Sequence, residues 1–412
     1  MDAPRKTEFH GVEAIRQEVI QTASLPLNRA TTLPRQAYVD EEYFRFEADN
    51  VLKSGWLCVG HVSQIKEPGN FLALDLLSEP LLVLRGKDGV VRALSRVCAH
   101  RGMDIMPDGF DFARAGHASL LSCPYHRWTY NLDGTLRGCA QMQEADNFDK
   151  KDWRLFEFNS EIWHGFVFVN LDGKAMPLSE QYDEFGARIA PWRTEDMEVA
   201  IAMEWTCDFN WKIMVENWME SYHHLGAHSA TLNPMMPGER TWTEKEHPYF
   251  ARAHLPFTPQ YKDDLQRVDE TGQRLAGFAP IPGLSDAQQS EWGLYLGYPC
   301  FMFLTMPDRV LWYRLLPEKA GRCKLLTATL VARESLNAPN LAAILPAETK
   351  LMRNFHLEDM MVNTAMQRGL SSSKAVRGRL SHLEEPVWLI QRYLAARAEG
   401  RYPGAGAAQA AK

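Results

Sequence analysis

Two short loops carry the thiols and imidazoles that are most able to do chemistry in this sequence. Cys98 and His100 lie in VCAHRGM, and Cys123 and His126 lie in CPYHRWTY. Such a set binds a soft or borderline centre, either zinc or an iron–sulfur cluster. A zinc-binding loop usually supplies two ligands of the same residue type, whereas each loop here supplies one Cys and one His. This mixed pairing favours a [2Fe–2S] centre in which one iron takes both thiolates and the other takes both imidazoles.

A second group of candidate ligands lies in WKIMVENWMESYHHLGAH, residues 211–228. Two imidazoles and one carboxylate on one side of an iron leave positions open for O2 and a substrate. On a regular helix His224 and His228 share a face, whereas His223 and His228 lie roughly 140° apart and need a distorted helix. Gly226, which lies between them, is a residue at which a helix can break. The spacing alone leaves both pairs open.

The third ligand of such a site must come from another segment. In NFHLEDMMVNTAMQRGL, residues 354–370, Glu358 and Asp359 are adjacent acids on a predicted helix. Adjacent helical residues point about 100° apart, so only one of the two carboxylates can face a metal.

The elements that must position these residues change in kind along the chain. Residues 1–40 predict an N-terminal arm with one short helix, and residues 41–55 predict a helix that ends at Gly55. From 56 to 172, short strand-like runs alternate with turns such as Lys87-Asp88-Gly89, which predicts a small all-β domain beginning at residue 41.

The remainder of the chain predicts a second, α+β domain over 173–400, with a tail of low complexity from 401 to 412 that we expect to be disordered. Its expected elements are a strand at 204–211, a helix at 212–225, an excursion or lid at 230–290, strands at 294–305, 309–316 and 323–333, and a long helix at about 346–368.

Both candidate metal sites resemble motifs of one known family. The segment CAHRGMDI … CPYHRWTYNLDGTL closely resembles the Rieske motif of the ring-hydroxylating non-haem iron oxygenases, in their α (large) subunit. The resemblance implies that Cys98 and Cys123 bind one iron of the cluster and that His100 and His126 bind the other. Residues 107–119 look like an insertion in the spacer between the two loops.

The second segment resembles the mononuclear-iron motif of the same family, E-N-x-x-E-x-Y-H-x-x-x-x-H. By this resemblance His223 and His228 are the histidine ligands, Glu220 falls at the family's acid position, and Asn217 lies one turn earlier. The E-D … Q-R-G pattern near the C-terminus resembles the segment in which the Asp completes the triad, which implies Asp359.

The resemblance also implies a fold, a reaction and an assembly. The fold is α+β: a small all-β Rieske [2Fe–2S] domain followed by a helix-grip (Bet v 1/START-like) catalytic domain with an antiparallel sheet. The cluster stores an electron for a mononuclear Fe(II) that uses O2 to oxidise the substrate. The family forms trimers, with or without a small β subunit, in which Glu220 links His100 or His126 of one chain to His223 of the next.

Electrons must reach this chain from outside. No G-x-G-x-x-G follows a predicted strand and no P-loop is present, so we expect no flavin or NAD(P)H site. A separate reductase, with or without a ferredoxin, is the expected electron donor.

Composition excludes several other classes of protein. The net charge of −7 over 412 residues argues against nucleic acid as a ligand. Seven scattered cysteines do not form a disulfide framework, which favours a reducing compartment. The N-terminus lacks the apolar region of a secretory signal, and no run of about eighteen apolar residues suggests a membrane span. We therefore expect a cytoplasmic protein.

The substrate is the least determined feature of the sequence. Aromatic residues between 240 and 313, some of which should line an apolar pocket, favour ring hydroxylation or dihydroxylation of an aromatic compound. Four arginines, Arg240, Arg252, Arg314 and Arg353, are candidates for binding a carboxylate, which would make the substrate an aromatic acid. The alternative is a monooxygenase for oxidative N- or O-demethylation or for quaternary-amine oxidation, because aromatic walls also hold methylammonium groups.

Overall fold

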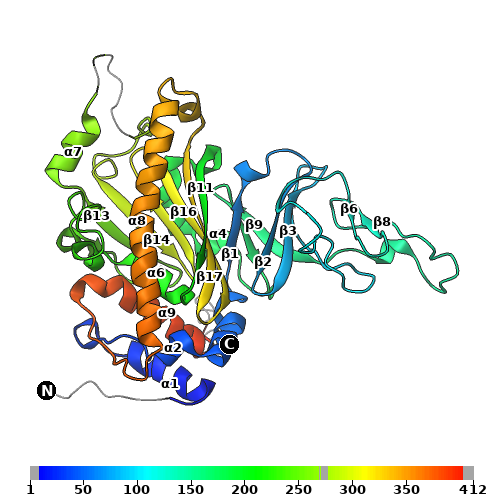
Figure 1. The fold of residues 1–412 in the computed structure, drawn as a ribbon, viewed down its shortest axis with the longest axis horizontal. Helices are drawn as coiled ribbons and strands as arrows, with labels where there is room; N and C mark the ends of the chain where they lie inside the picture. Colours follow the sequence, from blue (N-terminus) through cyan, green and yellow to red (C-terminus); the bar gives the residue numbers. More distant parts are fainter. Residues whose placement is uncertain (1–8, 269, 271–276, 402–412) are drawn as a thin grey trace, which may run out of the picture. The chain divides into compact units, whose positions relative to one another are not determined.

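The computed structural model describes residues 9–268, 270 and 277–401, and the chain forms two compact units. The smaller unit is Trp56–Leu178, and the larger unit combines Met1–Gly55 with Ser179–Lys412. Figure 1 labels the elements and colours the chain along its sequence. The tail expected from 401 onward lies, apart from Arg401, outside the described residues.

The expected domain borders differ from these units at both ends of the β domain. Residues 41–55, expected with the β domain, belong to the larger unit. Helix α3 (Glu41–Glu47) buries Tyr43 and Phe44 there, and Glu47 forms a buried ion pair with Lys212 at 2.5 Å. The segment therefore joins the larger unit through long-range contacts that a local reading of the sequence cannot detect.

At the other border, residues 173–178 belong to the smaller unit although we expected them in the catalytic domain. The backbone N–H of Leu178 donates to Oε2 of Glu161 at 3.1 Å, and the indole N–H of Trp56 donates to the carbonyl of Met176 at 2.9 Å. These hydrogen bonds hold the segment against the β strands that precede it.

The smaller unit is built from antiparallel strands, which confirms the predicted all-β domain. Its two sheets have the orders β1-β10-β9-β4-β3-β2-β5 and β6-β7-β8. The strands are β1 (Leu57–His61), β2 (Asn70–Leu76), β3 (Glu79–Arg85), β4 (Val91–Ser95), β5 (Ala115–His117), β6 (Leu121–Ser122), β7 (Thr129–Tyr130), β8 (Leu136–Gly138), β9 (Glu157–Trp163) and β10 (Phe166–Asn170).

The larger unit contains a seven-stranded antiparallel sheet with the order β11-β17-β16-β15-β14-β13-β12. The strands are β11 (Met197–Cys207), β12 (Trp242–Thr243), β13 (Phe250–Pro256), β14 (Glu291–Gly297), β15 (Phe301–Thr305), β16 (Val310–Lys319) and β17 (Arg322–Ala332). The single strand expected at 294–305 is therefore two strands, β14 and β15. The described residues of 230–290 form more than a free excursion, since they contribute β12, β13 and a helix to this unit.

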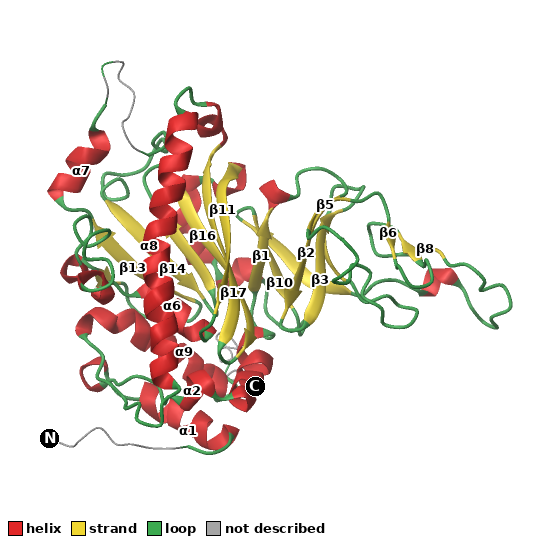
Figure 2. Cartoon of the chain, in the orientation of Figure 1, coloured by secondary structure: helices red, strands yellow, loops and turns green. Residues whose placement is uncertain are grey.

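Helix α8 (Leu341–Leu370) runs across one face of this sheet, as Figures 1 and 2 show. Its buried side chains form a stripe at helical spacing, which comprises Glu348, Met352, Phe355, His356, Asp359, Asn363 and Gln367. The other helices are α1 (Val12–Ala23), α2 (Gln36–Val39), α3, α4 (Leu178–Gln181), α5 (Asp183–Ile189), α6 (Trp211–Met219), α7 (Pro259–Gln266) and α9 (Glu385–Ala398). Among the described helices, none combines the length and hydropathy that a bilayer-spanning segment requires.

Helix α6 is shorter than the sequence predicted, and this decides the orientation of the histidines that follow it. Asn210 begins the helix, its side chain accepting a hydrogen bond from the N–H of Lys212 at 2.9 Å. The helix ends at Met219 because the backbone of Glu220 is extended, with φ −115° and ψ 150°. The next residues, Tyr222–Leu225, form a separate 3-10 helix, so the angle calculated for a regular helix does not apply to His223 and His228.

Candidate active site

Two loops with matching backbone hydrogen bonds carry the four predicted cluster ligands. In each loop the Cys N–H donates to the carbonyl of the residue five positions later, at 2.8 Å for Cys98 and 2.9 Å for Cys123. The N–H four positions later donates back to the Cys carbonyl, from Gly102 at 3.0 Å and from Arg127 at 3.1 Å. Both of these residues have positive φ, 71° and 60°. The same turn therefore presents a thiol from each loop.

The thiols are buried and the imidazoles lie at the surface of the unit. Cys98 and Cys123 are each 2% exposed, and both are free. The rings of His100 and His126 lie 4.8 Å apart between centroids, with His126 exposed. The indole of Trp128 stacks on His100 at 4.7 Å and separates it from the core. The arrangement separates a thiol pair inside from an imidazole pair outside.

Tyr130 supports one thiol of the cluster site. Its hydroxyl oxygen lies 3.1 Å from Sγ of Cys98 and accepts a hydrogen bond from the N–H of Ala99 at 3.0 Å. Burial, with the neighbouring Cys98, raises the pKa of Tyr130 above its usual value, so the hydroxyl stays protonated and can donate to a Cys98 thiolate. Burial and His126 lower the pKa of His100, which favours the neutral imidazole that a metal takes. This donor set fits a [2Fe–2S] cluster with two thiolate and two imidazole ligands.

The second group of predicted ligands meets between the end of α6 and the middle of α8. One donor atom each from His223, His228 and Asp359 lies within 4.8 Å of the others. Nε2 of His228 is 2.9 Å and Nε2 of His223 is 3.5 Å from Oδ1 of Asp359. The same nitrogen of both rings thus faces one carboxylate oxygen. A 2-His-1-carboxylate set of this kind fits a non-haem Fe(II).

His224 and Glu358, the two alternative ligands left open by the sequence, make other contacts. Nδ1 of His224 is hydrogen-bonded to the carbonyl oxygen of Met236 at 2.9 Å, and the side chain is buried. Burial and His223 lower the pKa of His224 to about 4, so it is a neutral imidazole held by the backbone. Glu358 contacts Nδ1 of His228 at 2.7 Å, on the side of the ring opposite Asp359, and also accepts a hydrogen bond from Thr231 at 2.6 Å. Thr231 was not singled out from the sequence, because no spacing rule links it to α8.

Glu220 contacts the other predicted histidine ligand, His223. Its carboxylate lies 2.7 Å from Nδ1 of His223 and accepts a hydrogen bond from the backbone N–H of the same residue at 3.1 Å. Burial lowers the pKa of His223, but the hydrogen bonds with Asp359 and Glu220 outweigh it and raise the pKa to about 10. Burial alone would raise the pKa of Asp359. Its pKa nevertheless lies well below its usual value, because both histidines face the carboxylate.

Asn217 lies in α6 and connects this helix to α8. Its side-chain oxygen accepts a hydrogen bond from Nδ2 of Asn363 at 3.3 Å, one turn beyond Asp359. Next to it, Glu216 accepts a hydrogen bond from the hydroxyl of Tyr38 at 2.8 Å in the buried layer under α6. These contacts fix α6 against α8 and against the N-terminal segment.

A cavity of about 60 Å³ adjoins the three predicted iron ligands. Leu294, Leu304 and Leu311 pair across three adjacent strands and form a row in its wall. Its aromatic lining comprises Trp218, Trp292, Tyr313 and Phe355. The described lining residues include no Arg or Lys, so the four arginines considered for carboxylate binding do not reach this cavity.

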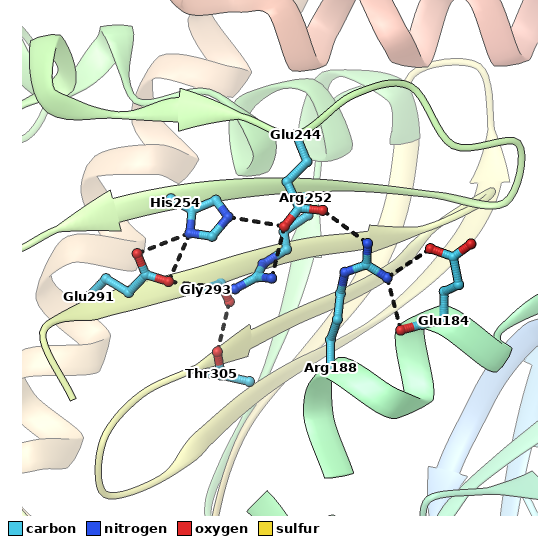
Figure 3. A network of polar contacts seen from close by, with 8 residues as sticks. All are labelled: Glu184, Arg188, Glu244, Arg252, His254, Glu291, Gly293 and Thr305. Atoms are coloured by element: carbon cyan, nitrogen blue, oxygen red, sulfur yellow. Dashed lines mark hydrogen bonds and ion pairs between the residues drawn. The ribbon is translucent and has the colours of Figure 1, made fainter. Parts of the chain in front are cut away.

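Most of the aromatic and charged residues of this sheet lie on its other face, because side chains alternate along a strand. Leu255 and Trp292 are paired across β13 and β14 and line the cavity, whereas their neighbours His254 and Glu291 belong to a polar network. Figure 3 shows this network, in which Arg252 bonds Glu244 at 2.9 Å. Of the aromatic residues between 240 and 313, the cavity thus takes Trp292 and Tyr313, while Trp218 and Phe355 come from segments outside that range.

Comparison with known families agrees with this geometry. Residues 183–400, more than half of the chain, match the family described as ring hydroxylating alpha subunit (catalytic domain), and residues 55–149 match the Rieske [2Fe-2S] domain. The chain belongs to the Rieske non-haem iron oxygenases. This oxygenase therefore takes the cofactors of its family, a Rieske [2Fe–2S] cluster and a mononuclear iron, and the predicted family and fold class are confirmed.

Relatives of this oxygenase act on two kinds of substrate. It is 30% identical over 281 residues to the carnitine monooxygenase oxygenase subunit of Acinetobacter pittii, covering 68% of this chain and 69% of the relative. It is 33% identical over 273 residues to the 2-aminobenzenesulfonate 2,3-dioxygenase subunit alpha of an Alcaligenes species, covering 62% of this chain and 66% of the relative.

Solved structures share the fold of the oxygenase. A quaternary ammonium Rieske monooxygenase superposes with a TM-score of 0.76 at 24% identity, covering 92% of this chain and 98% of the other. Naphthalene 1,2-dioxygenase from a Rhodococcus species superposes with a TM-score of 0.69 at 18% identity, covering 94% and 99%. The chain is an oxygenase of a family whose members take electrons from a reductase and act on small molecules.

Proposed function

We propose that this oxygenase hydroxylates or dihydroxylates an uncharged aromatic ring in the cavity beside His223, His228 and Asp359. The observation that carries the proposal is the position of these three side chains in the wall of an apolar cavity. Iron held by them supplies O2 activation, and the cluster supplies an electron. The leucine row and the aromatic side chains hold a flat apolar ring and exclude water from the metal.

The metal ligands are part of this proposal. His223, His228 and Asp359 are the proposed ligands of the mononuclear iron, with His224 outside the set because its Nδ1 is hydrogen-bonded to a backbone carbonyl. Cys98, His100, Cys123 and His126 are the proposed ligands of the cluster, supported by the paired loops and by the burial of both thiols.

An aromatic acid is less favoured than an uncharged ring. A buried carboxylate needs a cation or several donors to replace its hydration, and the cavity wall has no Arg or Lys among its described residues. A quaternary amine is the second candidate, because Trp218 and Tyr313, whose ring centroids lie 4.5 Å apart, can hold a methylammonium group and Glu220 lies in the same wall.

The electron is proposed to cross between chains. Glu220 already holds Nδ1 of His223, and among the described residues its second oxygen accepts a hydrogen bond from a backbone N–H alone. In a homotrimer, with or without a β subunit, this carboxylate links His223 to His100 or His126 of the adjacent chain. We further propose a separate reductase, with or without a ferredoxin, and a cytoplasmic location, in keeping with seven cysteines that form no disulfide among the described residues.

Turnover with isotopically labelled O2 tests the substrate proposal. The iron-loaded oxygenase, a surrogate reductase and NADH are incubated with ethylbenzene, benzoate or a trimethylammonium compound. We expect O2 uptake and labelled oxygen on the ring of ethylbenzene. Formaldehyde release with the trimethylammonium compound alone would favour the second candidate instead.

Mixed trimers test the electron path. Chains carrying Asp359→Asn keep the cluster, and chains carrying His126→Ala keep the iron site. We expect activity after the two inactive variants are dissociated and reassembled together. If reassembled wild type is active and the mixture of variants is not, transfer between chains is contradicted. If reassembled wild type is inactive as well, the trimers have failed to assemble.

A further inference from the structure

A second cavity, of about 130 Å³, lies beside the one at the metal ligands. The two cavities share the wall residues Leu232, Trp292, Leu311 and Phe355. The two cavities are therefore adjacent between α8 and the sheet, and the space that they span together is called the passage below. The second cavity continues away from Asp359, toward the N-terminal part of α8, where Met352 and Glu348 line it.

Helix α8 gives the length of this passage. Asp359 and Glu348 lie eleven positions apart on the buried stripe of the helix. At a rise of about 1.5 Å per residue, they are roughly 16 Å apart along the helix axis. A single ring at the metal ligands leaves most of this length unfilled.

The far end of the passage carries an excess of negative charge. Arg309 bonds Asp308 through Nε and Nη2, both at 3.0 Å, and bonds Glu348 through Nη1 at 2.5 Å. All three side chains are buried. Two carboxylates thus face one guanidinium. A ligand carboxylate would add a third acid to one buried cation, whereas an amine or hydroxyl can donate to Glu348.

We propose that the second cavity binds the tail of an elongated substrate that ends in an amine or a hydroxyl group. The inference rests on the proposed function, because the reacting ring occupies the first cavity. The tail passes Phe355 and Met352 along α8. Its terminal group donates a hydrogen bond to the carboxylate of Glu348. The substrate is therefore an amphipathic molecule with an apolar body, rather than a small amine or a simple arene.

Binding measurements that need no turnover test the proposal. Isothermal titration calorimetry on the oxidised holoenzyme compares phenyloctylamine, phenyloctanol, phenyloctanoate and ethylbenzene. We expect phenyloctylamine to bind at least about a hundredfold tighter than ethylbenzene, because each buried methylene contributes roughly a fourfold factor. The carboxylate should bind at least about tenfold more weakly than the amine.

Two variants distinguish the second cavity from nonspecific apolar binding. Met352→Trp fills the cavity and should remove the advantage of the long ligands over ethylbenzene, whereas Met352→Leu conserves volume and should keep it. Glu348→Gln leaves the Asp308–Arg309 pair balanced and should reduce the preference for the amine over the carboxylate by about tenfold. Thermal unfolding of each variant verifies that it is folded.

The outcomes separate this inference from the proposed function. Equal affinity for short and long ligands, tighter binding of the carboxylate, or no effect of Met352→Trp overturns the tail site, even if ethylbenzene is hydroxylated. The expected binding pattern without oxygen incorporation into any ring keeps the tail site and overturns the proposed reaction.

Discussion

The carboxylate of Glu358 lies 2.7 Å from Nδ1 of His228. The opposite nitrogen of the same ring faces Asp359 at 2.9 Å. Two adjacent acids of α8 thus contact the two nitrogens of one imidazole. The sequence allowed only one of them to face a metal, and the geometry gives the other a distinct task, because a carboxylate on Nδ1 fixes the tautomer and the orientation of a ligating ring.

Removing Glu358 should therefore weaken iron binding without removing a ligand. For Glu358→Ala we expect about 10- to 100-fold weaker retention of the mononuclear iron, measured by iron content after dialysis against graded chelator. The cluster content should not change. Glu358→Gln, which keeps an acceptor oxygen, is the matched control and should lose less iron. Equal retention in wild type and Glu358→Ala would contradict the orienting role.

His223 and His224 should behave oppositely when each is replaced by Ala. The family's cofactors predict roughly three irons and two acid-labile sulfides per chain. We expect His223→Ala to lose about one iron and all O2-dependent turnover, with an unchanged EPR signal from the reduced cluster. His224→Ala should keep the iron, because its ring is hydrogen-bonded to a carbonyl. Retained turnover in His223→Ala is the result that excludes our ligand set.

Tyr130→Phe should lower the reduction potential of the cluster. The hydroxyl lies 3.1 Å from Sγ of Cys98, and hydrogen bonds to sulfur stabilise the reduced, more negative state. A hydrogen bond to a charged group contributes about 1.5–3 kcal/mol, which corresponds to a fall of roughly 60–130 mV for one electron. Redox titration followed by EPR measures it. Tyr125→Phe, at an exposed tyrosine of the same loop, is the control, and equal potentials in all three proteins would refute the assignment.

Glu216 should make the stability of the larger unit depend on pH. Burial raises its pKa from 4.5 to about 7, against the opposing hydrogen bond from Tyr38 and charge of Lys212. The folded protein thus holds a proton that the unfolded chain releases. The resulting stability is complete below about pH 4.5 and is lost as the pH rises through about 7.

The variant Glu216→Gln removes this titration. The free energy of unfolding of the variant minus that of wild type should rise by about 2.5 kcal/mol between about pH 5 and about pH 8. Urea titrations of both proteins at the two pH values measure the difference. A constant offset between the proteins across this range would show that Glu216 does not titrate there.

The residues proposed to bind metal could be selected from the sequence because their types and local spacing carry the chemistry. Cys98 and Cys123 lie in loops with the same hydrogen-bonding pattern, and such short-range geometry is encoded in a few neighbouring residues. The choice between His223 and His224 was not accessible from helical spacing, since the helix ends at Met219 and the calculated angle assumed that it continued.

Long-range contacts explain most of what the sequence did not predict. The segment containing Glu47 joins the larger unit through a partner, Lys212, that lies far away in the chain. The cavity wall was only partly predicted, because the direction of each aromatic side chain depends on strand register. Phe303 and Tyr295 pair directly across β14 and β15, and on the face opposite the cavity Tyr295 stacks on Phe185 while Phe303 meets Phe185 edge-on.

The buried stripe of α8 limits how the gene of such an enzyme can change. Phe355 and Asp359 share one helical face, and inserting a single codon between them would rotate the second by about 100° and withdraw it from His228. Replacing Phe355 or Met352 changes the space along the passage and leaves the carboxylate in register. Replacements on α8 should therefore give this scaffold access to new substrates, whereas insertions and deletions there would displace the proposed iron ligand Asp359.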